Sequence, residues 1–484
     1  MGNTVVCKPS ELTPMTANLL MEVIDEVGLP EGVVNLVHGD GLGAGSSLVS
    51  HGDVDLVSFT GGTSTGSEVA KAAAPQFKKI SLELGGKNSS IVLDDCEIDS
   101  TVKGVVRSGF LNQGQVCLCG SRVLVQRGIY ESFVDAFATH ATPEGFPHHF
   151  WVSGGSLAVE NAMKTAFDWK ARKLGRTDFT HSVNDLVILH FRQAFHGRSG
   201  YTMSVTNTLP DKVGLYPKFD WPRVHNPTVH YDLDGNISNE VAAEETRACG
   251  EIEAAFAKAE SEGRHIAAIL IEPMQGEGGD NHFRPEFMQA LRNFADEREA
   301  LLLYDEVQTG FFGSGKPWFW QHQGVAPDVV SFGKKTQVCG IYASSRVEEV
   351  EDHVFARSSR INSTWGGNLV DMVRCQRILE IIVEENLADH ITSIGDHVIQ
   401  GLRSIARETE AFTNVRGRGS LIAFTFNPAE ARREMIAALF DRRVIALPSG
   451  EDSVRFRLPL NITKDDADEL LNRVESCVPL LTRA

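Results

Sequence analysis

The sequence predicts an α/β protein with two successive parallel-sheet regions, followed by a smaller α+β region. Short Val-, Ile- and Leu-rich runs alternate with helical stretches over residues 1 to about 140, and a second set of apolar runs begins near Phe150. Strands that alternate with helices in this way are typical of parallel sheets covered on both faces. A turn-rich segment at 142–147 separates the two sets, so we expect regions at 1–140, 145–385 and 386–484.

The expected strands are apolar runs bounded by Gly, Asp and Asn residues. In the first region they cover residues 33–37, 54–59 and 90–93, with helices expected over 17–27 and 68–74. In the second region they cover 186–189, 266–271, 300–304 and 329–332, and in the third region 421–424 and 454–458. The runs of the second region are almost continuously apolar, which predicts strands buried on both faces.

Charge and composition argue against several classes of protein. The chain has 42% apolar and 23% charged residues, as globular proteins do, and its 46 Lys and Arg against 64 Asp and Glu give a net charge of −18. Such a surface disfavours nucleic-acid and anionic-membrane binding, and no apolar run is long enough to span a membrane. The eight cysteines lack disulfide-framework or zinc-site spacing, and the sequence begins without a signal-peptide pattern. We therefore expect a cytoplasmic protein with reduced thiols and no bound metal.

A thiol and a carboxylate in the first region form the first candidate site. Cys117 lies in the Gly-rich stretch 112–122, and Glu83 precedes a tight turn about thirty residues earlier. The N–H donors of such a turn lower the pKa of a thiol and stabilise an oxyanion, and a carboxylate can act as a general base. Taken alone, the same residues also describe a buried, inert thiol.

Together with the motifs at 8–11 and 59–66, these residues resemble the aldehyde dehydrogenase family from about residue 2 to about residue 138. The resemblance implies part of a Rossmann-like domain, with Cys117 as the nucleophile and Glu83 as the general base. It also implies NAD(P) contacts at Lys8, Glu11, Gly61 and Gly66. Long portions that precede and follow these motifs in that family have no counterpart here. NAD(P)-dependent aldehyde oxidation is therefore the alternative function, and an inactive fusion is a further one.

The second region contains three features that together suit one cofactor. Gly155 and Ser156 open a helix, and the N–H groups of a helix start favour a phosphate. Asp305 ends an apolar strand, where a carboxylate can pair with a protonated pyridine nitrogen. About thirty residues later, Lys334 and Lys335 end the next strand, and a lysine in a cleft can form a Schiff base. These features in this order predict a pyridoxal-phosphate site.

Each feature also has a simpler explanation. The helix start is equally an ordinary N-cap by Ser153, and paired lysines usually lie on a solvated surface. The strand that ends at Asp305 and the loop 310–317 also resemble the two sequence motifs that bind nucleoside triphosphates with Mg²⁺. That interpretation fails because Pro317 stands where such a loop needs a Mg²⁺-binding Ser or Thr.

The region from residue 147 to the end resembles the class III (fold type I) aminotransferases, and its lysine-specific branch most closely. The motifs that carry the resemblance are at 195–201, 272–280, 332–340 and 362–368. The resemblance implies a large pyridoxal-phosphate-binding domain with a small α+β domain after it. About a hundred residues that precede the Gly-Gly-Ser turn in that family have no counterpart here.

The resemblance implies a role for individual cofactor-binding residues. Lys334 binds pyridoxal phosphate covalently and transfers the proton, with Lys335 as the alternative. Asp305 binds the ring nitrogen and Gln308 the hydroxyl group. Gly155, Ser156 and, from a neighbouring subunit, Thr364 would bind the phosphate. Phe195 would stack on the pyridine ring, and His196 is a further cofactor-binding residue.

The resemblance also implies a reaction: the ε-amine of L-lysine is transferred to 2-oxoglutarate, which gives 2-aminoadipate 6-semialdehyde and glutamate. Arg198 would bind the α-carboxylate of lysine, since a guanidinium can hold a carboxylate with two hydrogen bonds. Arg455 would bind 2-oxoglutarate, with Arg457 as the weaker alternative, and Glu277 would screen it while lysine is bound. Asn362 is a further substrate contact, and a homodimer is expected.

Overall fold

The computed structural model divides the chain into two compact units, residues 1–136 and 137–484, which are described separately. The residues that the structure describes are 2–86, 88–110, 119–120, 122–126, 145–176, 178, 183–362, 366–367 and 369–481.

The first unit consists of short parallel strand pairs and helices. Its described residues form three pairs: β1 with β2, β3 with β4, and β5 with β6. The strands are β1 (Val5–Cys7), β2 (Val34–Leu36), β3 (Leu56–Gly61), β4 (Lys79–Leu84), β5 (Ser89–Val92) and β6 (Arg122–Val125). The helices are α1 (Met15–Glu26), α2 (Ser46–Ser50), α3 (Thr63–Ala73) and α4 (Ile98–Phe110). Few of these side chains are buried, and α1 buries none.

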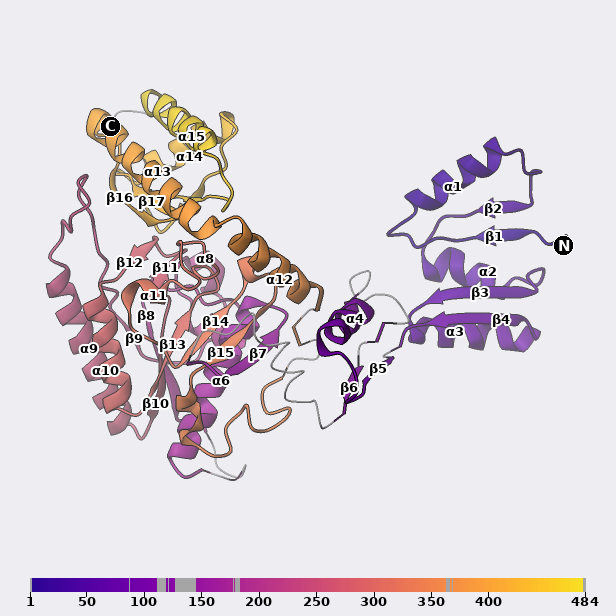
Figure 1. Ribbon diagram of the computed structural model, residues 1–484, viewed down its shortest axis with the longest axis horizontal. Helices are drawn as coiled ribbons and strands as arrows, with labels where there is room; N and C mark the ends of the chain where they lie inside the picture. The colour runs from indigo at the N-terminus through magenta and orange to yellow at the C-terminus, as the bar shows by residue number, and fades with distance from the viewer. Residues whose placement is uncertain are drawn as a thin grey trace. The chain divides into compact units, whose positions relative to one another are not determined.

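The second unit contains a seven-stranded sheet with the strand order β7-β15-β14-β13-β10-β8-β9 (Figure 1). Its strands are β7 (His148–Val152), β8 (Leu186–Phe191), β9 (Arg223–Val224), β10 (His265–Ile271), β13 (Leu301–Asp305), β14 (Val329–Phe332) and β15 (Cys339–Ala343). The central strands are buried along their whole length, as their continuous apolar sequences require. Helices α6 (Gly155–Lys173), α9 (Val241–Ser261) and α10 (Pro285–Glu297) pack on the sheet.

Strand direction brings several chain segments to one edge of this sheet. Strands β8, β10, β13 and β14 are parallel, while β15 is antiparallel to both β14 and β7. The carboxyl ends of β7, β8, β10, β13 and β14 therefore lie at the same edge. In open α/β sheets this edge is where ligands bind. The segments that follow these five strands begin at Ser153, Arg192, Glu272, Glu306 and Gly333.

A four-stranded antiparallel sheet with its own hydrophobic core follows in the C-terminal part. Its strand order is β16-β17-β19-β18. The strands are β16 (Thr413–Arg418), β17 (Leu421–Thr425), β18 (Leu447–Ser449) and β19 (Ser453–Arg457). The helices of this part are α13 (Leu387–Thr409), α14 (Glu430–Asp441) and α15 (Lys464–Cys477). Helix α12 (Leu369–Glu384) precedes them, and the shortest elements are α7 (Gly200–Val205), α8 (Pro210–Val213), α11 (Trp320–Gln323), β11 (Met274–Gln275) and β12 (Asn281–His282). The apolar side chains of this part form a cluster between residues 394 and 477.

The α/β fold class is confirmed, and every strand expected from an apolar run has a counterpart in the structure. Strands β1, β4, β6, β7, β9, β11, β12, β15, β16 and β18 are additional to those expected. Among the described residues, no helix combines the length and apolar character needed to cross a membrane. The same residues contain no group of three or more His, Cys, Asp and Glu suited to a metal ion, and none of their cysteines is in a disulfide.

Candidate active site at the carboxyl edge of the large sheet

Asp305 and His196 form a buried pair at the centre of this edge. His196 lies in the loop after β8, and Asp305 is the last residue of β13. The Nδ1–H of His196 donates to Oδ2 of Asp305 over 2.8 Å, and the backbone N–H of Val307 donates to Oδ1 over 3.0 Å. Both Asp305 oxygens therefore have a hydrogen-bond donor. The other ring nitrogen of His196 is buried without a partner among the described residues.

The two adjacent lysines after β14 have different environments. Lys334, at φ 54°, keeps an exposed side chain. Desolvation by the surrounding protein lowers the pKa of its amine, and the carboxylates of Asp305 and Glu272 act in the opposite direction. Lys335 instead donates to the backbone carbonyls of Gln308 and Gly310, and burial lowers its pKa to about 7. Among the described residues, Lys334 is thus the lysine of the pair whose amine has no hydrogen-bond partner, and the charge of Asp305 acts on it.

The first turn of α6 and the loop after β8 meet at Ser156. Its hydroxyl oxygen lies 2.5 Å from that of Ser199 and 2.8 Å from that of Thr202. Gly197 makes this approach possible, because its φ is +121° and a Cβ there would lie 2.4 Å from the Ser156 oxygen. Gly155 is equally confined, since its Cβ would lie 2.7 Å from Cγ1 of Val307. Backbone N–H groups at a helix start such as this one favour an anion, for example a phosphate.

Glu272, which follows β10, connects two segments of the site. Its Oε1 accepts from the N–H of Phe195 over 2.9 Å, and its Oε2 accepts from the N–H of Gly276 over 3.0 Å. The pKa of Glu272 is raised to about 7, mainly by burial. The charge of Asp305 raises this pKa as well, whereas His196 lowers it. The Phe195 ring is within 5.7 Å of the Nζ of Lys212.

Two arginines of β19 reach the site from the small sheet. Arg455 and Arg457 both donate to Oε1 of Gln308, over 3.1 and 2.6 Å. Arg457 also donates to Oδ1 of Asp280 over 2.6 Å, whereas Arg455 is 4.0 Å from the other oxygen of Asp280. Arg416 of β16 donates to the backbone carbonyls of Gly279 and Asp280 and to the hydroxyl of Ser453, which ties the small sheet to this loop.

The remaining predicted substrate residues are more dispersed. Glu277 accepts from Thr208 over 3.0 Å and forms an ion pair with Lys212. It makes no hydrogen bond to Arg455 among the described contacts, but its charge raises the pKa of that guanidinium. Arg198 and Asn362 are exposed, in the loop before α7 and in the segment before α12. Thr364 lies outside the described residues.

The predicted dehydrogenase residues lie in the first unit. Lys8 donates to the carbonyls of Pro9 and Gly39 and lies 3.6 Å from the carboxylate of Glu11. Gly61 ends β3, and Glu83 is exposed on β4. Gly66 is buried in α3, where a Cβ would lie 2.5 Å from Leu84. Cys117 lies outside the described residues, so the structure does not bear on its pairing with Glu83.

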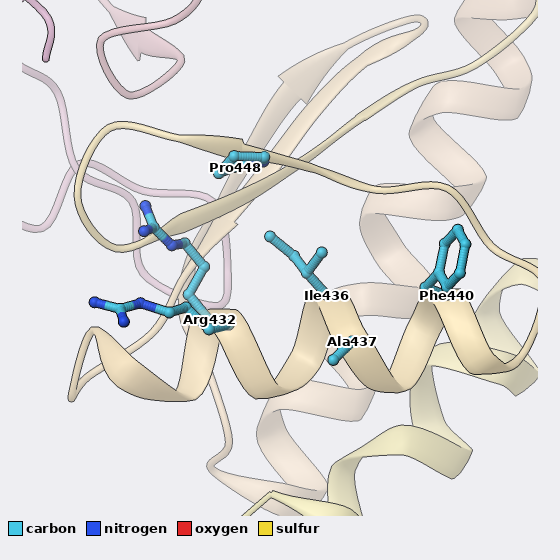
Figure 2. Close-up of a pocket in the computed structure, with 6 residues that line it drawn as sticks. Arg432, Ile436, Ala437, Phe440 and Pro448 are labelled. Atoms are coloured by element: carbon cyan, nitrogen blue, oxygen red, sulfur yellow. The ribbon is translucent and has the colours of Figure 1, made fainter. Parts of the chain in front are cut away.

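A groove between α14 and β18 lies apart from these residues (Figure 2). Arg432, Ile436, Ala437 and Phe440 project from α14, and Pro448 lies opposite them. Its lining is mainly apolar, and it contains none of the residues predicted from the sequence. This groove is therefore not the candidate site.

The residues at the sheet edge fit pyridoxal phosphate. The site provides a hydrogen-bonded carboxylate for a protonated ring nitrogen, a desolvated amine for an aldehyde, and a helix start for a phosphate. Glycines at 155, 197 and 276 leave space where side chains would collide with site residues. These features define a pyridoxal-phosphate enzyme.

Comparison with known proteins assigns both parts of the chain. The model of the class-III aminotransferase family matches residues 112–478, and that of the aldehyde dehydrogenase family matches residues 1–163. The L-lysine-epsilon aminotransferase of Mycobacterium tuberculosis is 47% identical over 354 residues, which are 72% of this chain and 77% of that protein. The 2-aminomuconic semialdehyde dehydrogenase of Homo sapiens is 48% identical over 175 residues, or 36% of each chain.

A solved structure supports the same assignment. The lysine aminotransferase from M. tuberculosis in its internal aldimine form superposes with a TM-score of 0.67 and 46% identity, covering 74% of this chain and 81% of that chain. The chain belongs to the class-III aminotransferase family: it is an aminotransferase of fold type I that uses pyridoxal phosphate. It is also a chimera, because a segment of the aldehyde dehydrogenase family, matching about a third of that relative, precedes the aminotransferase.

Sequence reasoning assigned no role to several residues of this site. Glu272 and Asp280 lie within a motif that was used for the resemblance, but neither received a function. Their positions could have been singled out only as acidic residues in a Gly-rich loop after a buried strand. Ser199 also lies within a motif of the resemblance without a role of its own, and Lys212 carries no sequence signal, because its partner Glu277 is 65 residues away.

Proposed function

We propose that the chain transfers the ε-amino group of L-lysine to 2-oxoglutarate, giving 2-aminoadipate 6-semialdehyde and glutamate. The lysine-epsilon aminotransferases that match most of the chain at 47% identity support this choice of donor. The observation that carries the proposal is the convergence of Asp305, Lys334 and Gln308 at one edge of the sheet, with the β19 arginines beside them.

In this proposal, Lys334 binds the cofactor covalently, Asp305 faces the ring nitrogen and Phe195 stacks on the ring. Gln308 binds the hydroxyl group, and His196 orients Asp305 through the 2.8 Å hydrogen bond. The phosphate is held by Gly155, Ser156 and, from a second subunit, Thr364, so a homodimer is part of the proposal. Bound pyridoxal phosphate supplies an aldehyde for the amines and an electron-withdrawing ring.

Lys334 moves the proton. Because desolvation lowers the pKa of its amine, a larger fraction of the amine is neutral than in water. Once substrate amine has replaced it on the cofactor, the neutral amine can accept a proton from Cε of L-lysine and return it in the second half of the reaction. Asp305 and Glu272 keep the protonated form accessible, since their carboxylates raise the same pKa.

Substrate carboxylates are bound by arginines. Arg198 is exposed and binds the α-carboxylate of L-lysine, together with Asn362. Arg455 binds the carboxylate of 2-oxoglutarate next to the reacting carbon. For Glu277 to screen Arg455 while L-lysine is bound, its carboxylate has to leave Lys212 and Thr208.

The test compares Lys334→Ala with Lys335→Met in the full chain. We expect the unchanged protein to bind pyridoxal phosphate, to show its absorbance and to form glutamate from L-lysine and 2-oxoglutarate. Lys334→Ala removes the covalently bound cofactor and the activity. Lys335→Met keeps the absorbance but lowers the melting temperature, because the carbonyls of Gln308 and Gly310 lose their donor.

Other outcomes contradict the proposal in different ways. An unchanged spectrum in Lys334→Ala refutes that lysine as the attachment point. Cofactor binding without lysine-dependent glutamate formation refutes the substrates, and ornithine or another ω-amine is then tested as the donor. A chain that binds no pyridoxal phosphate supports an inactive fusion. Aldehyde-dependent NADH formation that Cys117→Ser abolishes supports the alternative oxidation.

A further inference from the structure

The side-chain amide of Gln308 has one orientation that satisfies its neighbours. Arg455 and Arg457 both point N–H groups at its Oε1, over 3.1 and 2.6 Å. A guanidinium only donates hydrogen bonds, so the amide end that faces β19 has to be the oxygen. The NH₂ group of Gln308 therefore faces away from the arginines and is the end left for a ligand with an acceptor oxygen.

Gly276 confines this amide from another side. A Cβ at position 276 would lie 2.2 Å from Oε1 of Gln308 and 2.7 Å from its nitrogen. The amide is thus packed directly against the backbone of the loop that follows Glu272. Two arginines and this backbone leave the group little freedom to rotate.

The two arginines differ in how their charge is balanced. Arg457 pairs with Asp280 over 2.6 Å, and Asp280, which is only 1% exposed, also accepts from the Ser449 hydroxyl over 2.7 Å. Arg455 lies 4.0 Å from Asp280, whereas the Nε atoms of both arginines are buried without a partner among the described residues. Of the two, Arg455 is thus the arginine without a close carboxylate partner, and its charge remains for a substrate carboxylate.

We propose that Arg457 is a positioning residue: paired with Asp280, it fixes the Gln308 amide with its NH₂ group toward the cofactor and leaves Arg455 free for the carboxylate of the amino acceptor. This inference rests on the proposed function, in which Gln308 contacts the cofactor and Arg455 contacts 2-oxoglutarate. Arg457 itself touches neither the cofactor nor the substrate.

Removal of Arg457 has two separable effects. Asp280 stays buried without its closest cation, and Arg455, 4.0 Å away, becomes its partner and is withdrawn from the acceptor. Gln308 loses its shorter hydrogen bond and can rotate, which changes the hydrogen bond offered to the cofactor hydroxyl. The first effect changes affinity for 2-oxoglutarate, and the second changes the pH dependence of the cofactor absorbance.

The test uses Arg457→Met, Arg457→Lys and the double variant Arg457→Met with Asp280→Asn, each loaded with pyridoxal phosphate. In Arg457→Met, we expect KM for 2-oxoglutarate to rise about tenfold, as for other broken charge pairs, while KM for L-lysine stays within about a factor of two. The midpoint of the pH-dependent absorbance change of the bound cofactor shifts. Arg457→Lys recovers part of the loss in KM, because the charge beside Asp280 is restored.

The double variant tests the cause. Without the buried carboxylate, Arg455 has no reason to leave the acceptor site, so KM for 2-oxoglutarate falls back toward that of the unchanged enzyme. Arg433→Met, an exposed arginine on α14, serves as the matched control and leaves both measurements unchanged. Melting temperatures verify that all variants are folded.

Two results overturn the proposal. One is a folded Arg457→Met variant with the KM values and absorbance profile of the unchanged enzyme. The other is an equal rise in both KM values that Arg457→Lys does not reduce, which indicates a general structural role. Failure of the proposed function looks different, because the unchanged chain then binds no cofactor or forms no glutamate. If the unchanged chain binds pyridoxal phosphate but forms no glutamate, the pH dependence of the cofactor absorbance in Arg457→Met still decides the role of Arg457.

Discussion

Glu272 is a buried carboxyl group on which two segments of the active site depend. It accepts from the N–H groups of Phe195 and Gly276, and burial raises its pKa to about 7. A carboxyl group with a raised pKa in the folded state binds its proton more tightly there than in the unfolded chain. Its contribution to stability is therefore full at low pH and is lost as the pH rises from about 4.5 to about 7.

The variant Glu272→Gln removes this titration. In the apoprotein, we expect the unchanged chain to lose up to about 3 kcal/mol more unfolding free energy than the variant between about pH 5 and about pH 8. Urea unfolding at the two pH values measures the difference. Glu253→Gln, at an exposed position of α9, is the control and keeps the slope of the unchanged protein. If the unfolding free energy changes equally with pH in both variants, Glu272 does not titrate between the two pH values and its carboxyl group is ionised at both.

Single residues also show where sequence reasoning stops. Asp305 and the lysine pair could be selected because each ends a buried apolar strand, a position that the sequence displays. The choice between Lys334 and Lys335 could not be made, since it depends on which amine meets the carbonyls of Gln308 and Gly310. The pairing of Arg457 with Asp280 joins residues 177 positions apart and follows only from the folded chain.

At the scale of elements, the contact between α6 and the loop after β8 depends on Gly197. Its backbone is in the left-handed region, and a side chain there would collide with the Ser156 and Thr202 hydroxyl groups. We expect Gly197→Ala to destabilise the protein by about 1–3 kcal/mol and to weaken pyridoxal-phosphate binding, because the first turn of α6 is displaced. Thermal melting and cofactor titration measure the two effects.

Gly200 provides the matched control for this prediction. It is the first residue of α7, and the nearest atom to its Cβ position is a carboxylate oxygen of Glu160 at 3.7 Å. Gly200→Ala should therefore retain the melting temperature and the cofactor affinity. Equal cofactor affinity in both variants would mean that the first turn of α6 does not need the close approach at Gly197.

The elements that sequence reasoning found are those with continuous apolar sequences, such as β8, β10 and β13. Strand β15 was not expected, because a glycine interrupts the apolar run in Cys-Gly-Ile-Tyr-Ala. It is a strand because β14 and β7 pair with it on both sides. Strand β7 begins with two histidines, and it too is a strand because it pairs with β15. The region boundaries expected near 140–145 and 385–386 remain predictions.

On the scale of the whole molecule, the two units differ in how much apolar surface they bury. In the first unit, Leu12, Leu42 and Phe77 are 87%, 90% and 95% exposed. The second unit instead contains a large continuous core around its seven-stranded sheet. A region that buries few apolar side chains gains little free energy to offset the entropy of folding.

We expect the second unit to account for the stability of the chain. A protein that begins at Phe137 should keep the main melting transition and the pyridoxal-phosphate absorbance of the full chain. Residues 1–136 alone should show no cooperative melting by circular dichroism. A truncated protein that loses its melting transition or its cofactor would instead show that the dehydrogenase-like segment is needed to complete the aminotransferase.

The hydrogen bonds of Arg416 have a mechanical consequence. Its guanidinium joins β16 and β19 to the loop carrying Asp280, so a tilt of the small sheet must pull that loop with it. Asp280 is in turn bonded to Arg457, and Arg457 to Gln308. A continuous series of hydrogen bonds thus couples the position of the small sheet to the orientation of the Gln308 amide.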